Sequence, residues 1–195
     1  CSVNLQPKAA ALLEGEEEII LTEQTLLAEQ LNQVPLYLTP QSFFQTQPVM
    51  AAALYQTAAD WAAQVQQQQG DFSRIWDLFC GVGGFGLHLT KPAQQLTGIE
   101  IAPAAIASAQ RSANELGLTR VRFQALDSAA FAKAAAQAPD LLVVNPPRRG
   151  LGEALCQDIQ RLAPHWLIYS SCNAQTLAQD LTALPDYKLL KVQLF

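Results

Sequence analysis

From residue 74 onward, short apolar runs alternate with amphipathic segments, and this alternation limits the possible folds more than any other feature of the sequence. We predict strands at residues 75–79, 96–101, 121–126, 141–144, 166–171 and 189–195. Between them we expect helices near residues 84–90, 103–116, 128–137, 151–162 and 173–183. Repeated strand–helix units form a mostly parallel, twisted sheet with helices on both faces. The sequence therefore predicts an α/β, Rossmann-like fold.

The first 40 residues show a different pattern. Their apolar runs lie at residues 9–13, 19–21 and 36–38, with turn signals between them. This pattern predicts a small antiparallel β meander. Because residue 1 is not Met and residues 192–195 resemble an unfinished strand, we expect a fragment. Residues 1–40 would be the remnant of a preceding domain, and residues 41–195 a main domain truncated at its C-terminal end.

One further helix is expected to begin at Pro48, because proline suits the first turn of a helix. Four side chains recur on one face and are predicted to be buried: Leu54, Ala58, Trp61 and Val65. The glutamine run at residues 66–69 and Gly70 predict a low-complexity linker after this helix.

Composition excludes several classes of protein. No apolar run approaches the roughly 18 residues of a membrane span, and no signal-peptide pattern opens the chain, so we expect a cytoplasmic protein without a membrane partner. The four cysteines lack CxxC pairing, so neither a disulfide framework nor a metal site is predicted. The net charge of −5 argues against binding nucleic acid through the overall field, although Arg148 and Arg149 supply local positive charge.

A glycine-rich segment at residues 77–86 follows the first strand of the main domain and leads into a helix. Gly81, Gly83 and Gly86 match G-x-G-x-x-G, and Glu100 follows Gly81 by 19 residues, at the end of the next strand. Glycines let the backbone approach a ligand closely, and an acidic residue there can accept both ribose hydroxyls. We therefore predict a nucleoside-containing cofactor, with a NAD-binding oxidoreductase as an alternative.

Two strand ends beyond the glycine loop add polar groups to the same predicted sheet edge. Asp127 ends the third strand, where it can contact an adenine edge or, equally, cap the following helix. Asn145-Pro146-Pro147 ends the fourth strand, and its prolines stop the strand and stiffen the loop in which Asn145 can orient a ligand. This ending is familiar from methyltransferases acting on amino groups, but Arg148 stands where those enzymes have an aromatic residue.

Cys172 is the candidate nucleophile. It lies between the predicted strand at residues 166–171 and a helix that Asn173 is expected to cap. Ligands of open α/β sheets bind at that edge, and the partial positive charge of a helix N-terminus favours a thiolate there. The alternative is a small buried residue, as most free cysteines are.

Together these motifs resemble the RNA (uracil-5-)-methyltransferase family, in order and spacing, over nearly the whole chain. They are Gln45 within residues 42–45, the loop at residues 77–86, Glu100, residues 145–150 and residues 171–173. The similarity is greatest to members that act on 23S ribosomal RNA. It implies a class I S-adenosylmethionine-dependent methyltransferase fold and methylation of C5 of a uridine.

The resemblance also implies roles for individual residues. Cofactor contacts are implied for Gln45, Phe79, Glu100 and Asn145, in addition to Gly81, Gly83 and Asp127 predicted above. Relatives often carry Asp at the position of Asn145. Cys172 would add to C6 of the uracil, and Arg148 and Arg149 would contact RNA phosphates or bases, unless they are solvated surface charges.

Three parts implied by the family are not found in these residues. A base must remove the C5 proton, and in the family it is a glutamate in a His-containing motif that would lie beyond Phe195. An N-terminal RNA-binding region and a cysteine-ligated iron–sulfur cluster are expected only in the full-length parent. We therefore expect this chain to bind cofactor but to turn over RNA poorly, with no obligate protein partner.

Overall fold

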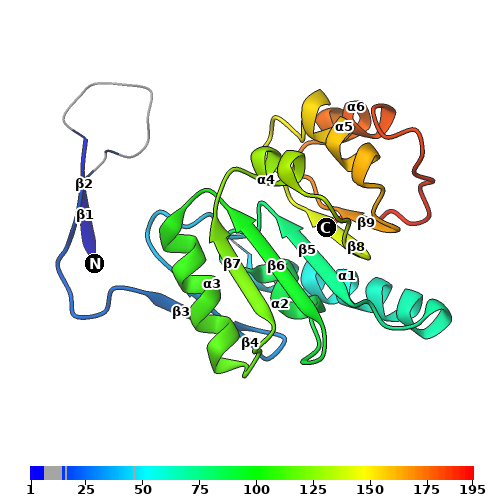
Figure 1. Ribbon diagram of the computed structural model, residues 1–195. Helices are drawn as coiled ribbons and strands as arrows, with labels where there is room; N and C mark the ends of the chain where they lie inside the picture. The colour runs from blue at the N-terminus through cyan, green and yellow to red at the C-terminus, as the bar shows by residue number, and fades with distance from the viewer. Residues whose placement is uncertain (7–14, 16, 46) are drawn as a thin grey trace.

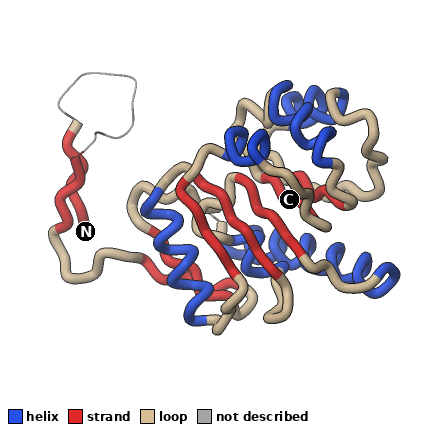
Figure 2. Tube along the Cα trace, viewed as in Figure 1, coloured by secondary structure: helices blue, strands red, loops and turns tan. Residues whose placement is uncertain are grey.

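The computed structural model describes residues 1–6, 15, 17–45 and 47–195, and its main feature is a five-stranded parallel sheet (Figures 1 and 2). The strand order is β7 (Val121–Ala125), β6 (Gln95–Glu100), β5 (Arg74–Leu78), β8 (Leu141–Val144) and β9 (Trp166–Tyr169). The predicted parallel α/β architecture is confirmed. The chain moves outward from β5 in one direction and then, through β8, in the other, so the order reverses between these two strands.

The register of the sheet aligns the ends of four strands. Leu78 of β5 pairs with Ile99 of β6 on one side and with Val144 of β8 on the other, and Val144 pairs with Tyr169 of β9. The residues that follow these strands therefore emerge together at the carboxyl edge. In open α/β sheets, ligands bind at this edge where the strand order reverses.

Helices cover both faces of the sheet. One apolar cluster includes residues from α1 (Pro48–Gln69), α2 (Gly84–Leu89) and α3 (Pro103–Glu115). The other includes residues from α4 (Ser128–Ala134) and α5 (Glu153–Leu162), and α6 (Ala174–Thr182) lies beside α5 (Figure 1). Residues of β5 and β8 alternate between the two clusters, as the pleat of a strand buried on both faces requires. No helix in the described residues is long and apolar enough to cross a membrane.

The N-terminal part forms two separate antiparallel hairpins in place of one continuous meander. β1 (Ser2–Leu5) pairs with β2 (Glu17–Ile20), and β3 (Leu27–Leu31) pairs with β4 (Val34–Leu38). The apolar run predicted at residues 9–13 lies outside the described residues. The β1–β2 hairpin extends away from the sheet in Figure 1, whereas β3–β4 contributes buried residues to the cluster around α1.

Helix α1 begins at Pro48 as predicted, but its buried face differs from the prediction. The buried residues are Ala51, Tyr55, Ala58, Ala62 and Gln66, whereas Leu54, Trp61 and Val65 are only half-buried. Alanines let the helix approach the core closely, so the larger apolar residues lie at its margin. The predicted linker is also wrong, because Gln66 to Gln69 are helical and buried Gln66 accepts a hydrogen bond from Gln94 Nε2 at 2.7 Å.

The predicted strand at residues 189–195 is not present. These residues pair with no strand among the described residues, and their apolar side chains are largely exposed, up to 87% at Leu194. An apolar run becomes a strand only when a neighbouring strand accepts its backbone hydrogen bonds. Lys191 instead contacts Gln64 and lies 5.8 Å from the ring centre of Trp61, both on α1.

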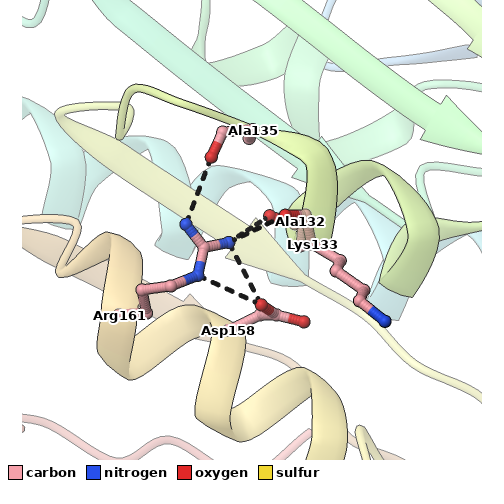
Figure 3. Close-up of polar contacts among 5 residues, drawn as sticks. All are labelled: Ala132, Lys133, Ala135, Asp158 and Arg161. Carbon is pink, nitrogen blue, oxygen red and sulfur yellow. Dashed lines mark hydrogen bonds and ion pairs between the residues drawn. The ribbon is translucent and has the colours of Figure 1, made fainter.

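Arg161 joins the two helices of the second layer (Figure 3). From the last turn of α5, its guanidinium donates to the carbonyls of Ala132 at 2.8 Å, Lys133 at 3.2 Å and Ala135 at 3.2 Å. It also pairs with Asp158 at 3.1 Å. The last carbonyls of a helix lack partners within that helix, and Arg161 satisfies them at the end of α4. The helix ends at Ala134, earlier than the predicted residue 137.

Candidate active site

A cleft of about 1690 Å³ runs from the carboxyl edge of the sheet, past α1, to the amino end of β9 at Trp166. Nearly all the site residues predicted from the sequence line it: Gln45, Phe79, Gly81, Glu100, Asp127, Asn145, Arg148, Arg149 and Cys172. They come from the loop before α1 and from the ends of β5, β6, β7, β8 and β9. The parallel topology therefore gathers residues that are up to 127 positions apart, from 45 to 172, around one space.

The loop between β5 and α2 has an unusual backbone. Phe79 has φ +60° and Gly81 has φ +52°. A left-handed conformation costs about 1 kcal/mol or more in a residue with a bulky side chain, and it persists only where the surroundings hold it. Here Phe79 N donates to Ser128 Oγ at 3.2 Å, and Cys80 N donates to Ile99 O at 3.0 Å. The loop is thus held in one shape beneath the cleft.

Glu100, at the end of β6, also holds the loop between β5 and α2. Its Oε2 accepts a hydrogen bond from Gly81 N at 3.2 Å, and its Oε1 accepts one from Ala102 N at 3.1 Å. Each carboxylate oxygen can accept a second hydrogen bond. A β-carbon at Gly81 would meet no atom within 4 Å, so the space beside it is open to a ligand. Glu100 is therefore both oriented and able to accept hydroxyl groups from the cleft.

Asp77 is a functional candidate that the sequence reasoning gave no role. It lies at 0% exposure on β5, its Oδ2 accepts from Gly86 N at 2.7 Å, and its Oδ1 has no partner among the described residues. Burial and, to a smaller extent, the negative charge of Glu100 raise the pKa of Asp77 to about 7, although the hydrogen bond from Gly86 N lowers it. The available signal was an acidic residue inside an otherwise apolar strand.

Two predicted cofactor residues have clear structural roles. Gly83 does not line the cleft; its N–H donates to Cys80 O at 2.8 Å, and a β-carbon there would lie 3.0 Å from Leu87 Cδ1. Gly83 therefore has a role in helix packing, and its contact with a cofactor stays a prediction. Asp127 lines the cleft and also caps α4, because its Oδ1 accepts from Ala130 N at 2.8 Å.

The segment after β8 leaves its functional side chains available. Asn145 N donates to Leu78 O at 3.4 Å, while the Asn145 amide makes no hydrogen bond to any residue that the structure describes. Arg148 and Arg149 are exposed, and neither guanidinium bonds to a described residue. The carbonyl of Arg148, by contrast, accepts from Asn173 Nδ2 at 3.1 Å and from Thr176 Oγ1 at 3.2 Å. Hydrogen bonds therefore hold the backbone of this segment at Asn145 and Arg148, while the side chains of Asn145, Arg148 and Arg149 remain available to a ligand.

Cys172 is exposed in the cleft, so burial as a packing residue is excluded for it. Cys80 and Cys156 are the cysteines that are buried in the described structure. Asn173 caps α6 as predicted, because its Oδ1 accepts from Gln175 N at 3.0 Å. Ser171 Oγ accepts from Asn173 N at 3.0 Å and fixes the turn that carries Cys172. No group of three or more possible metal ligands occurs in the described part of the chain.

Comparisons with known proteins show which family this sequence matches. Residues 16–195 match the family model described as tRNA (Uracil-5-)-methyltransferase. Curated proteins from Salmonella typhimurium and Salmonella typhi, both named 23S rRNA (uracil(747)-C(5))-methyltransferase RlmC, are 58% identical over 194 residues, which cover 100% of this chain and 50% of each relative. This chain thus spans about half the length of the curated relatives it matches.

Solved structures show the same fold. The crystal structure of Pyrococcus abyssi tRNA (uracil-54, C5)-methyltransferase in complex with S-adenosyl-L-homocysteine has a TM-score of 0.74 and 26% identity, covering 93% of this chain and 42% of that one. Trm5b from Pyrococcus abyssi has a TM-score of 0.61 and 17% identity, covering 90% and 52%. The predicted Rossmann-like fold of the S-adenosylmethionine-dependent methyltransferases is therefore confirmed.

Proposed function

Because the chain belongs to the tRNA (uracil-5-)-methyltransferase family, we propose that it binds S-adenosylmethionine and carries the nucleophile for C5 methylation of a uridine in 23S ribosomal RNA. One observation supports this proposal above others. The exposed thiol of Cys172 lines the same cleft as the glycine loop, Glu100 and Asn145. With this substrate, the proposed location of the protein is the cytoplasm.

The residues of the cleft fit this cofactor. Glu100 has acceptor capacity for the ribose hydroxyls, and the open space at Gly81 allows close approach to the backbone. Asn145, Gln45, Asp127 and Phe79 also line the cleft. Asn145 and Gln45 are proposed to orient the amino-acid part, and Asp127 and Phe79 to contact the base. S-Adenosylmethionine supplies an electrophilic methyl group on a sulfonium.

Cys172 is proposed to act on the uracil. C5 of uracil is a weak nucleophile, so direct methyl transfer to it would be slow. When the thiolate of Cys172 forms a bond to C6, the C5–C6 π electrons move toward C5 and O4, and C5 becomes an enolate-like carbon that accepts the methyl group. Removal of the C5 proton then restores the C5–C6 double bond as the bond from sulfur to C6 breaks.

The proton-removing base is proposed to come from outside residues 1–195. Three carboxylates line the cleft among the described residues: Glu100, Asp127 and Asp186. Glu100 and Asp127 are held by backbone N–H groups where the proposal needs them for the cofactor, and Asp186 Oδ2 accepts from Gln160 Nε2 of α5 at 2.9 Å. His165 directly precedes β9, at the opposite end of that strand from Cys172. We therefore expect the chain alone to bind cofactor and to turn over RNA poorly.

Trapping with RNA that contains 5-fluorouridine tests the role of Cys172. Fluorine at C5 cannot leave as a proton, so the bond from sulfur to C6 persists and protein–RNA adducts accumulate in the presence of S-adenosylmethionine. In the longest natural form of the protein, we expect mass spectrometry to locate the adduct at Cys172. Cys172→Ala should abolish trapping and methylation, whereas the matched control Cys1→Ala, an exposed cysteine outside the cleft, should retain both.

Other outcomes would support the alternatives. Methylation that survives in Cys172→Ala would indicate an amino-group methyltransferase that uses residues 145–147. Calorimetry with S-adenosylhomocysteine and with NAD separates the oxidoreductase alternative, because binding of NAD alone would contradict the proposed cofactor.

A further inference from the structure

Asp180 is the one residue of α6 that is buried, at 6% exposure. A carboxylate is costly to bury unless donors surround it. Asp180 Oδ2 accepts from Leu151 N at 2.7 Å and from Tyr169 OH at 2.6 Å, and Oδ1 lies 3.3 Å from the donor Gly152 N. No ion pair among the described residues involves it. Its charge is therefore balanced by N–H groups that lead into α5 and by the hydroxyl of Tyr169 on β9.

The loop from Pro147 to Gly152 is shaped around this carboxylate. Gly150 has φ +79°, and a β-carbon there would lie 2.5 Å from Asp180 Oδ2. Gly152, the N-cap of α5, makes no capping bond with a side chain of its own, so Asp180 supplies negative charge at this helix N-terminus from another helix. The loop could not keep this path around a larger residue at position 150.

A second attachment lies one turn away on the same helix. Asn173, Thr176 and Asp180 are spaced i, i+3 and i+7, which places them on one face of α6. The first two donate to the carbonyl of Arg148, at 3.1 and 3.2 Å, and Asp180 holds Leu151 and Gly152. The helix thus holds both ends of the Arg148–Gly152 segment, over about 10 Å along its axis.

Cys172 directly precedes Asn173, the first residue of this face of α6. Because Asn173 both caps α6 and bonds to Arg148, any shift of the loop along the helix changes the distance between Cys172 and the segment that carries Arg148 and Arg149. Resting on the function proposed above, we propose that Asp180 is a positioning residue that sets the thiol and the RNA-binding loop at the spacing needed for attack on C6. Asp180 does not line the cleft, so it would act through the loop and not by touching substrate or cofactor.

The test compares variants along α6 in the longest natural form of the protein. Asp180→Asn keeps the shape of the side chain but replaces an acceptor with an amide that donates toward N–H groups. We expect it to lower kcat and the rate of trapping by 5-fluorouridine RNA about 10- to 100-fold, since misplacement by 1 Å can cost 100-fold. The KM for S-adenosylmethionine and the affinity for S-adenosylhomocysteine should stay unchanged. The calorimetric stoichiometry of S-adenosylhomocysteine binding should also stay unchanged, because loss of folded protein would lower it.

Thr176→Val keeps the proposal testable if Asp180→Asn does not fold. It removes a hydroxyl that lies within hydrogen-bonding distance of Arg148 O, at 3.2 Å, and of Asn173 O in its own helix turn, at 3.1 Å. The matched control is Thr182→Val, because the Thr182 hydroxyl bonds only within the helix, to Ala178 O at 3.0 Å. We expect the trapping rate to fall in Thr176→Val and not in Thr182→Val.

Two results would overturn the inference. Equal trapping rates in the two threonine variants, or a folded Asp180→Asn protein that traps RNA at the unmodified rate, would show that Asp180 serves only to cap α5. If the unmodified protein traps no RNA, or Cys172→Ala traps it equally well, the proposed function itself fails and the inference falls with it.

Discussion

Asp77 should make the stability of this protein depend on pH in the direction opposite to that of a typical carboxylate. Its pKa is about 7 in the folded protein, against 3.8 for an ordinary aspartate, because it is fully buried beneath the glycine loop near Glu100. Above pH 3.8 the unfolded chain releases this proton first. The stabilisation present in acid is therefore lost progressively as pH rises from about 4 through about 7.

The size of the effect follows from the pKa difference. A difference of about 3 corresponds to about 4 kcal/mol, at 1.36 kcal/mol for each pH unit. This is an upper bound for the loss on going from pH 4 to pH 8, and it is large beside a typical unfolding free energy of about 5–15 kcal/mol. Asp77→Asn cannot ionise, and its amide oxygen can still accept the hydrogen bond from Gly86 N.

Urea unfolding at pH values from 4 to 8, followed by tryptophan fluorescence, measures this difference. We expect the unfolding free energy of Asp77→Asn, minus that of the unmodified protein, to increase by as much as about 4 kcal/mol between pH 4 and pH 8. The control Val143→Ala removes buried volume at the register partner of Asp77 on β8 and should shift stability equally at every pH. Parallel curves for Asp77→Asn and the unmodified protein would refute the reasoning.

Two further predictions follow from the packing and the cleft. Arg161→Ala should lower the unfolding free energy by about 1–2 kcal/mol and speed hydrogen exchange at the end of α4, because it leaves three carbonyls without their shared donor. Unchanged hydrogen exchange at the end of α4 would contradict the capping role of Arg161. Glu100→Ala should weaken binding of S-adenosylhomocysteine in calorimetry about 10- to 100-fold, through loss of charge-assisted hydrogen bonds, and an unchanged affinity would show that Glu100 does not hold the ribose.

Local patterns were sufficient for most of the main domain. The strand predicted at residues 141–144 is β8, and the helices predicted from residues 84 and 103 begin at those positions. These elements are predictable because apolar periodicity, proline and glycine act within a few residues of themselves. The resemblance to the uracil-5-methyltransferase family rests on the same kind of local motif and is confirmed by the family model.

Predictions failed where the outcome depends on a partner distant in the sequence. The apolar run at residues 189–195 has no neighbouring strand and is not a strand, and Gln66 belongs to a helix because Gln94 satisfies its buried amide. Asp180 could not be recognised as important from the sequence, because its donors lie 28 to 29 residues earlier in the chain, at Leu151 and Gly152, as well as at Tyr169.

Cys172 shows most clearly which properties follow from local sequence and which depend on the tertiary structure. The sequence by itself determined that a cysteine stands between a strand and a helix capped by Asn173, since those signals are local. Only the tertiary structure decided that this thiol is exposed and shares a cleft with Glu100 and Asn145. The physical reason is that parallel pairing aligns the ends of strands that are distant in the sequence, while burial depends on what every other element leaves uncovered.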